Sequence, residues 1–231
     1  MLEQETKHTQ LGRPKDEGLA ARRRTEILRH AIAHFARSGF ANADLDAIAA
    51  DVGCAKGTIY RYFENKEDLF HRAVQLVMEE LLAATLAAPS DDPLEQLEHG
   101  IRSYLAYFDA HPKYVELLIQ ERAVFPSREK ATYFEHKDAN RGRWLSRFQE
   151  MMALGKLRQM PPERALDVIG DLLYGTIFTN YFAGRRKTLG QQVADVTDVL
   201  FHGLLTPEEA SLRAQRRGNA RTGENAGRSQ Q

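Results

Sequence analysis

The sequence predicts an all-α protein with a small N-terminal and a larger C-terminal helical domain. Apolar residues recur at steps of three and four along most of the chain, which is the spacing of an amphipathic helix. Glycine or proline separates successive periodic segments, and apolar and polar residues never alternate over the length of a strand. The 231 residues are 42% hydrophobic, so a core of ordinary size is available without disulfides or metals.

Each expected helix has recognisable ends. Helices are expected over residues 20–38, 45–52, 56–63, 66–87, 94–110, 113–125, 127–154, 162–183 and 189–204. Asp44 and Asn65 are placed to cap the helices that follow them, because their short side chains can accept hydrogen bonds from free backbone amides. Gly39 and Gly53 follow the last periodic residues of two helices, where glycine favours termination.

Two of these helices are short and lie close together in the chain. The helices over residues 45–52 and 56–63 are separated by the small residues Gly53, Cys54 and Ala55. This arrangement is typical of a helix-turn-helix motif. The long helix over residues 66–87 would then join the two domains.

Local charge, rather than overall charge, suggests a nucleic-acid partner. Lysine plus arginine and aspartate plus glutamate both number 32, so the overall balance gives no support. Basic residues gather near the N-terminus at Arg13, Lys15, Arg22, Arg23, Arg24 and Arg29. Such an arm either contacts phosphates or a minor groove, or is a solvated disordered tail, and the sequence leaves both interpretations open.

Membrane insertion and secretion find no support. No run approaches the roughly 18 consecutive apolar residues that a membrane span needs. The first ten residues are polar and lack the apolar segment of a signal peptide. Cys54 is the single cysteine and cannot form an internal disulfide. We therefore expect a cytoplasmic protein that makes no contact with a membrane.

The second short helix carries the groups that an element entering a DNA major groove requires. The candidate DNA-binding residues offer charge, hydroxyl groups or a closely approachable backbone, and they are Lys56, Gly57, Thr58, Tyr60, Arg61, Tyr62 and Lys66. Ile59 and Phe63, four residues apart, would hold this helix against its neighbours. At Lys66 both the side-chain charge and the dipole of the next helix would favour a phosphate.

The stretch over residues 46–70 closely resembles the DNA-binding motif of the TetR/AcrR family of repressors. The residues in step with that motif are Ile48, Ala49, Val52, Gly53, Gly57, Thr58, Tyr60, Tyr62, Phe63, Lys66, Glu67 and Leu69. The resemblance covers roughly residues 22–74, including Gly39 and Phe40, and beyond them it is one of architecture only. Ala43 and Asp44 depart from the family pattern, which commonly has a hydroxyl on a phosphate here, so Asp44 fits only as a helix cap.

The resemblance implies a homodimer that binds double-stranded operator DNA and is released from it by an unknown small-molecule ligand. It indicates a helix-turn-helix domain over residues 20–66 and a helical regulatory and dimerisation domain over 67–205. Composition predicts a flexible basic arm over residues 1–19 and a polar, disordered tail over 206–231. Ligand binding would tilt the linking helix and change the separation of the two recognition helices. No cofactor and no metal are expected.

The C-terminal domain holds the candidates for ligand binding and dimerisation. Aromatic side chains could enclose an apolar pocket, and the candidates are Tyr104, Phe108, Phe125, Trp144, Phe148, Tyr174 and Phe178. For any single one of them, ordinary core packing is the preferred interpretation. The resemblance places the dimer interface on the last two helices, where small residues among large ones permit close approach. The candidates are Ile169, Leu172, Leu173, Thr176, Val196, Val199 and Leu200.

Several residues and the direction of regulation allow more than one interpretation. Cys54 is either a packed small hydrophobe or, beside Lys56, a redox-sensitive thiol. His30 and His34 have a spacing that can bind metal, but no carboxylate-histidine motif surrounds them. The chain shows no catalytic motif, so a helical-bundle enzyme or carrier is the weaker hypothesis. Besides a repressor, the motif is compatible with a transcriptional activator and with a ligand-independent DNA-binding regulator.

Overall fold

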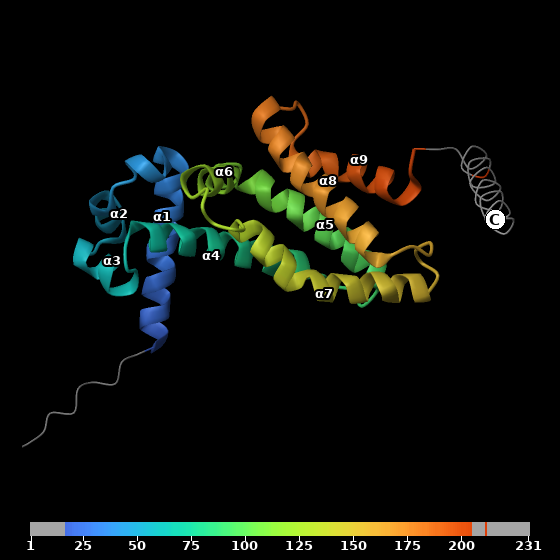
Figure 1. Cartoon of the computed structure of the whole chain (residues 1–231), viewed down its shortest axis with the longest axis horizontal. Coiled ribbons are helices and arrows are strands. Elements are labelled where there is room, and N and C mark those ends of the chain that lie inside the picture. The colour runs from blue at the N-terminus through green and yellow to red at the C-terminus, as the bar shows by residue number, and fades with distance from the viewer. Residues whose placement is uncertain (1–16, 205–210, 212–231) are drawn as a thin grey trace, which may run out of the picture.

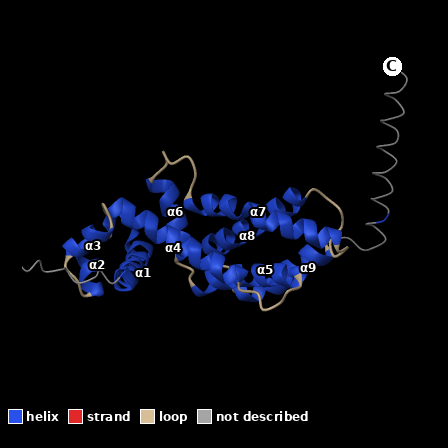
Figure 2. Cartoon of the chain, turned by 90° about the horizontal axis from the view of Figure 1, so that it is seen from below, coloured by secondary structure: helices blue, strands red, loops and turns tan. Residues whose placement is uncertain are grey.

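The structure, a computed structural model, confirms the all-α fold. It describes residues 17–204 and Ser211, and these residues form nine helices and no strand (Figures 1 and 2). The helices are α1 (Glu17–Asn42), α2 (Leu45–Val52), α3 (Lys56–Tyr62), α4 (Lys66–Leu86), α5 (Pro93–Ala110), α6 (Tyr114–Val124), α7 (Thr132–Ala153), α8 (Pro162–Ala183) and α9 (Leu189–His202). Most of the expected N-terminal arm, and the expected C-terminal tail apart from Ser211, lie outside the described residues.

The helices gather at two ends of an elongated molecule. Helices α1 to α3 lie together at one end, and α5, α7, α8 and α9 form a bundle at the other (Figure 1). Helix α4 runs between them and packs against α1, α5 and α7. Helix α6 also packs against α1, so the N-terminal helices are joined to the bundle by two elements.

Helix α1 changes direction at Gly39. This residue has φ 77° and ψ 160°, a conformation that is not helical and that side chains with a Cβ rarely adopt. The expected helix end at residue 38 therefore marks a real break, although three further residues, up to Asn42, still belong to α1. The Ala43 amide donates to the Gly39 carbonyl at 3.0 Å, and this bond closes the short turn after the break.

The ends of α2 and α4 are set by the expected residues. The Asp44 carboxylate accepts a hydrogen bond from the Asp46 amide at 2.9 Å, and the Asn65 side chain accepts one from the Asp68 amide at 2.8 Å. Gly53 ends α2 in the left-handed conformation, φ 70°, and its amide donates to α2 carbonyls. Local sequence therefore fixes the angle at which α3 follows α2.

Replacing Asp44 with alanine is expected to lower the free energy of unfolding by about 1 kcal/mol, because the substitution leaves an α2 amide without its acceptor. Urea denaturation followed by circular dichroism measures this change. Asp44→Ser keeps an oxygen at the cap and should stay close to wild type. Equal losses in the two variants would show that the Asp44 cap does not stabilise α2.

The expected helix over residues 127–154 is wrong at its start, because residues 126–130 form turns and α7 begins only at Thr132. The guanidinium of Arg122 donates to the carbonyls of Pro126 and Arg128, at 3.2 and 3.1 Å, and holds this segment in its turns. These bonds occupy carbonyl groups that an earlier helix start would have used. The remaining helix ends lie within a few residues of their expected positions.

An aromatic cluster joins the N-terminal helices to the rest of the molecule. The rings of Phe35 and Phe70 meet edge to face at 5.0 Å, and Phe40 meets Phe125 in the same way at the same distance. Phe70 also lies 5.7 Å from Phe125. Because these residues come from α1, α4 and the end of α6, the core is continuous between the two ends of the molecule.

Candidate DNA-binding surface and regulatory cavity

Helix α3 presents most of its surface to solvent. Among the described residues of this helix Ile59 is the buried one. Phe63, directly after the end of the helix, is also buried. Tyr60 is 49% exposed, and Gly57 and Arg61 are exposed beside it. The two apolar anchors thus hold one face of α3 against the protein and leave the opposite face free.

The other candidate DNA-binding residues are partly engaged within the protein. The Lys56 ammonium donates to Asp46 at 2.8 Å, and this hydrogen bond raises the pKa of Lys56. The Lys66 ammonium donates to the Ala41 carbonyl at 3.1 Å and lies 5.1 Å from the centre of the Phe40 ring. Lys66 therefore contacts the end of α1. Its location at the start of α4 in the sequence did not predict this contact.

Thr58 and Tyr62 are half-buried on the same helix. The Arg61 guanidinium lies 5.3 Å from the centre of the Tyr62 ring, which limits the orientations of both side chains. Of the seven candidates, Gly57, Tyr60 and Arg61 are the exposed ones. We expect these three to approach a DNA groove first.

The two histidines of α1 do not form a metal site with each other. His34 is buried, its Nε2 lies 2.7 Å from the Asp51 carboxylate, and Arg37 donates to its Nδ1 at 3.2 Å. The hydrogen bond from His34 lowers the pKa of Asp51. Among the described residues no group of three or more histidine, cysteine or acidic side chains could hold a metal ion. Cys54 is half-buried against the core, and no disulfide involves it.

A cavity of about 160 Å³ lies between α4, α5, α7 and α8. Three of the aromatic residues expected at a ligand site line it, Tyr104, Trp144 and Phe148. Tyr133 also lines it, and its hydroxyl lies 3.0 Å from that of Tyr104. Burial raises the pKa of Tyr104 well above its ordinary value and that of Tyr133 to about 12, so both phenols stay neutral at physiological pH and retain their hydrogens.

The other four aromatic candidates lie elsewhere. Phe108 is completely buried in the core, and Phe125 belongs to the aromatic cluster near α1. The rings of Tyr174 and Phe178 lie 4.5 Å apart outside the cavity, where Tyr174 borders a neighbouring groove. Lys137 and other residues of α7 line the cavity instead. The search for aromatic residues in the sequence did not identify Lys137 as a ligand candidate.

The outer face of α8 and α9 has an apolar strip beside charged residues, among them Arg185, Lys187 and Asp195. Leu172, Thr176, Val196 and Val199 line a shallow groove there, and Leu172 and Val199 are exposed large hydrophobic residues. The other candidates for a dimer interface have different places, because Ile169 and Leu173 line the internal cavity and Leu200 is packed against the core. Val168 and Phe182 are further exposed large hydrophobic residues of α8.

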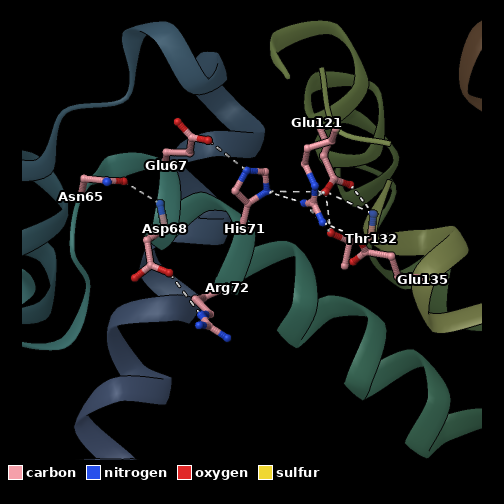
Figure 3. A network of polar contacts seen from close by, with 9 residues as sticks. Asn65, Glu67, Asp68, His71, Arg72, Glu121, Thr132 and Glu135 are labelled. Carbon is pink, nitrogen blue, oxygen red and sulfur yellow. Dashed lines mark hydrogen bonds and ion pairs between the residues drawn. The ribbon is translucent and has the colours of Figure 1, made fainter. Parts of the chain in front are cut away.

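A buried carboxylate connects α6 to α7. Glu121 is 1% exposed and accepts hydrogen bonds from the Arg128 guanidinium at 2.6 Å and from the Thr132 amide at 3.1 Å (Figure 3). His71 of α4 lies beside this pair, 2.9 Å from Arg128, and Arg128 also bonds Glu135 at 2.7 Å. Through these contacts α4 is tied to the start of the bundle.

Helix α6 also holds the end of α1. The Gln120 side chain accepts a hydrogen bond from the Phe40 amide at 2.9 Å and donates to the Phe35 carbonyl at 3.2 Å. Both bonds involve backbone groups on the two sides of the break at Gly39. Gln120 and Glu121 thus connect one helix to the N-terminal unit and to α7.

Comparison with known proteins bears on the N-terminal helices and on the whole fold. A family model described as bacterial regulatory proteins, tetR family, matches residues 27–73. These residues run from α1 through α2 and α3 into α4, and they include the exposed face described above. Residues 27–73 therefore match the tetR family of bacterial regulatory proteins. This finding confirms the resemblance detected from the motif around α3.

Curated proteins similar to this chain include named repressors. It is 34% identical over 106 residues to the HTH-type transcriptional repressor SCO4008 of Streptomyces coelicolor, covering 46% of this chain and 53% of that protein. It is 35% identical over 109 residues to the probable acrEF/envCD operon repressor of Escherichia coli K12, covering 46% of this chain and 49% of that protein. The matches therefore span about half the length of these relatives.

Solved structures resemble this chain over most of its length. The fatty acid degradation regulator FadR of Bacillus halodurans superposes with a TM-score of 0.66 at 21% identity, covering 78% of this chain and 99% of that one. The regulator FadR of Bacillus subtilis, solved in complex with stearoyl-CoA, gives a TM-score of 0.65 at 18% identity, covering 78% of this chain and 99% of that one. At these identities the likeness shows a shared fold.

Proposed function

We propose that this chain is a homodimeric transcriptional regulator, a repressor that leaves its operator when a small molecule binds the C-terminal domain. The exposed face of α3 is the observation that carries this proposal. A short helix held by two apolar anchors, with Tyr60 and Arg61 directed outward, has the size and chemistry for a major groove. Residues 20–66 are the proposed DNA-binding domain and residues 67–205 the regulatory and dimerisation domain.

The apolar strip on the outer face of α8 and α9 supports the dimer. Exposed apolar patches of this kind usually mark contacts with another protein. Pairing two chains also places two copies of α3 on one DNA molecule, where half-sites about one helical turn apart, ~34–36 Å, match successive major grooves. Operator DNA, a second copy of the chain and a small molecule are therefore the proposed partners, and a cytoplasmic location accompanies them.

Helix α4 gives the ligand a route to the DNA-binding domain. Leu81 and Thr85 of α4 line the cavity, whereas the first turn of the same helix follows α3 directly. A ligand that binds one tilt of α4 more tightly than another shifts the population of DNA-binding conformations. Differential affinities of this kind typically amount to about 1–3 kcal/mol, or roughly 5- to 150-fold in DNA affinity.

Binding of the purified protein to the duplex that flanks its own gene tests this proposal. We expect binding that falls steeply with salt, by about 0.9 in the logarithm of the association constant for each phosphate contact and each tenfold increase in salt. Fluorescence anisotropy at several salt concentrations measures this slope. A protein that binds no duplex, but binds small molecules in its cavity, would instead be a carrier or an enzyme. Reporter assays separate a repressor from an activator.

A further inference from the structure

The regulatory cavity has one charged side chain and no acidic one among the described residues that line it. Its walls are mostly aliphatic and aromatic, and its polar groups gather on α7, where Tyr133, His136, Lys137 and Asn140 occupy neighbouring turns. A cationic ligand would therefore lose its hydration without gaining a carboxylate. The electrostatic composition of the cavity favours a neutral or anionic ligand.

The ammonium group of Lys137 lies at the boundary between α7 and α8. A Cβ atom built on Gly170 would come within 3.2 Å of Lys137 Nζ, so the glycine leaves the space that this ammonium occupies. The Lys137 side chain is 24% exposed and forms an ion pair at 3.5 Å with Asp171, whose own side chain is 80% exposed. Asp138 and Asp167 also interact electrostatically with Lys137, and each of them forms its own ion pair, with Lys130 and Arg141 respectively. The contact with Asp171 is long and solvated, so a ligand carboxylate can replace it.

The tyrosine pair supplies a second donor. Tyr104 and Tyr133 share one hydrogen bond, in which either hydroxyl is the donor, so the hydrogen of the other hydroxyl remains available. Both phenols line the cavity, and Tyr133 lies one helical turn before Lys137 on α7. An acceptor oxygen near this turn thus meets an ammonium and, close by, a neutral hydroxyl.

The size of the cavity limits the apolar part of the ligand. A volume of about 160 Å³ is close to that of an engineered cavity, ~150 Å³, that holds benzene. Gly100 sets one wall, because a Cβ atom there would come within 3.1 Å of Trp144 Cη2 and displace the indole. The space therefore suits one aromatic ring or a short aliphatic chain.

We propose that the cavity binds a small apolar monocarboxylate, with the hydrocarbon part between Trp144 and Phe148 and the carboxylate at Lys137. This proposal rests on the regulatory role assigned to the C-terminal domain and adds the chemical class of the ligand. Lys137 is the residue that selects an anion, and the Tyr104 and Tyr133 pair offers a hydrogen bond to it.

Fluorescence of Trp144, the single tryptophan of the chain, tests the proposal without a label. The probes are phenylacetate, 2-phenylethanol and 2-phenylethylamine, which share one aromatic ring and differ in charge. We expect the carboxylate to bind about tenfold or more tightly than the alcohol, and the amine to bind most weakly. Equal affinities for the three compounds, or no response to millimolar phenylacetate, would overturn the proposal.

Variants of Lys137 assign the selectivity to one side chain. Lys137→Met should remove the preference for the carboxylate and leave the affinity for the alcohol unchanged, whereas Lys137→Arg should retain the preference. Lys130→Met is the matched control, because Lys130 is exposed, pairs with Asp138 and does not line the cavity. Retention of the preference in Lys137→Met would refute the assignment. If phenylacetate binds but leaves DNA affinity unchanged, the release mechanism fails while the ligand class stands.

Discussion

Replacing Tyr60 with alanine is expected to weaken binding of the dimer to its operator on the order of 100-fold. Tyr60 is half exposed and lies next to Arg61 on the free face of α3, so its side chain has no structural task comparable with that of the buried Ile59. A direct contact to DNA is typically worth about 1–3 kcal/mol, and a symmetric dimer loses it in both half-sites. Stability should change little, because surface substitutions usually stay within about 0.5 kcal/mol.

Fluorescence anisotropy with labelled operator DNA measures the loss, and urea denaturation checks that the variant is folded. Tyr60→Phe separates the hydroxyl from the ring. Arg61→Ala and Arg102→Ala form a matched pair, because each removes one exposed arginine, and Arg102 lies on α5, in the bundle. We expect only Arg61→Ala to reduce affinity and the salt slope. Wild-type affinity in Tyr60→Ala would contradict the proposed role of α3.

Local signals predicted most of the fold. Asp44, Gly53 and Asn65 act through hydrogen bonds within their own turns, so their effects can be recognised from a few neighbouring residues. The late start of α7 could not be recognised in this way. It depends on Arg122, which donates hydrogen bonds to two carbonyls beyond the end of its own helix. It also depends on Glu121, which accepts a hydrogen bond from the Thr132 amide.

The DNA-binding face was easier to predict than the cavity for a related reason. In α3 the two apolar anchors define the buried side, so the opposite side can be predicted to face solvent. Aromatic residues in a bundle offer no such contrast, because core and cavity walls use the same side chains. Phe125, for example, packs in a cluster with Phe40, which is distant in sequence, so its neighbours could not be predicted from local residues.

One signal for the cavity was nevertheless present in the sequence. Along α7 the residues Tyr133, Lys137, Asn140, Trp144 and Phe148 recur at steps of three and four, so they share one face of the helix. This stripe mixes aromatic and polar residues, and a search for aromatic residues alone does not find it. A stripe of this composition on a helix inside a bundle indicates a cavity wall better than any single ring does.

Replacing Arg128 with methionine is expected to lower the free energy of unfolding by about 3 kcal/mol. The substitution keeps much of the length of the side chain but leaves the carboxylate of Glu121, which is almost fully buried, without its cation. Breaking a buried ion pair from one side typically costs about 3–5 kcal/mol. Arg128 itself is 28% exposed, and solvent screening therefore places the expected loss at the lower end of this range.

Urea denaturation at one fixed protein concentration measures this loss, since the stability of a dimer depends on concentration. Arg102→Met is the control, because it breaks an exposed pair with Glu98 within α5, for which about 0.3–0.5 kcal/mol is typical. The double variant Glu121→Gln with Arg128→Met separates charge from packing. It should be more stable than Arg128→Met alone, because no unpaired charge is then buried. If the double variant is as unstable as the single one, the contribution of Arg128 lies in its bonds to His71, Thr132 and Glu135 rather than in neutralising Glu121.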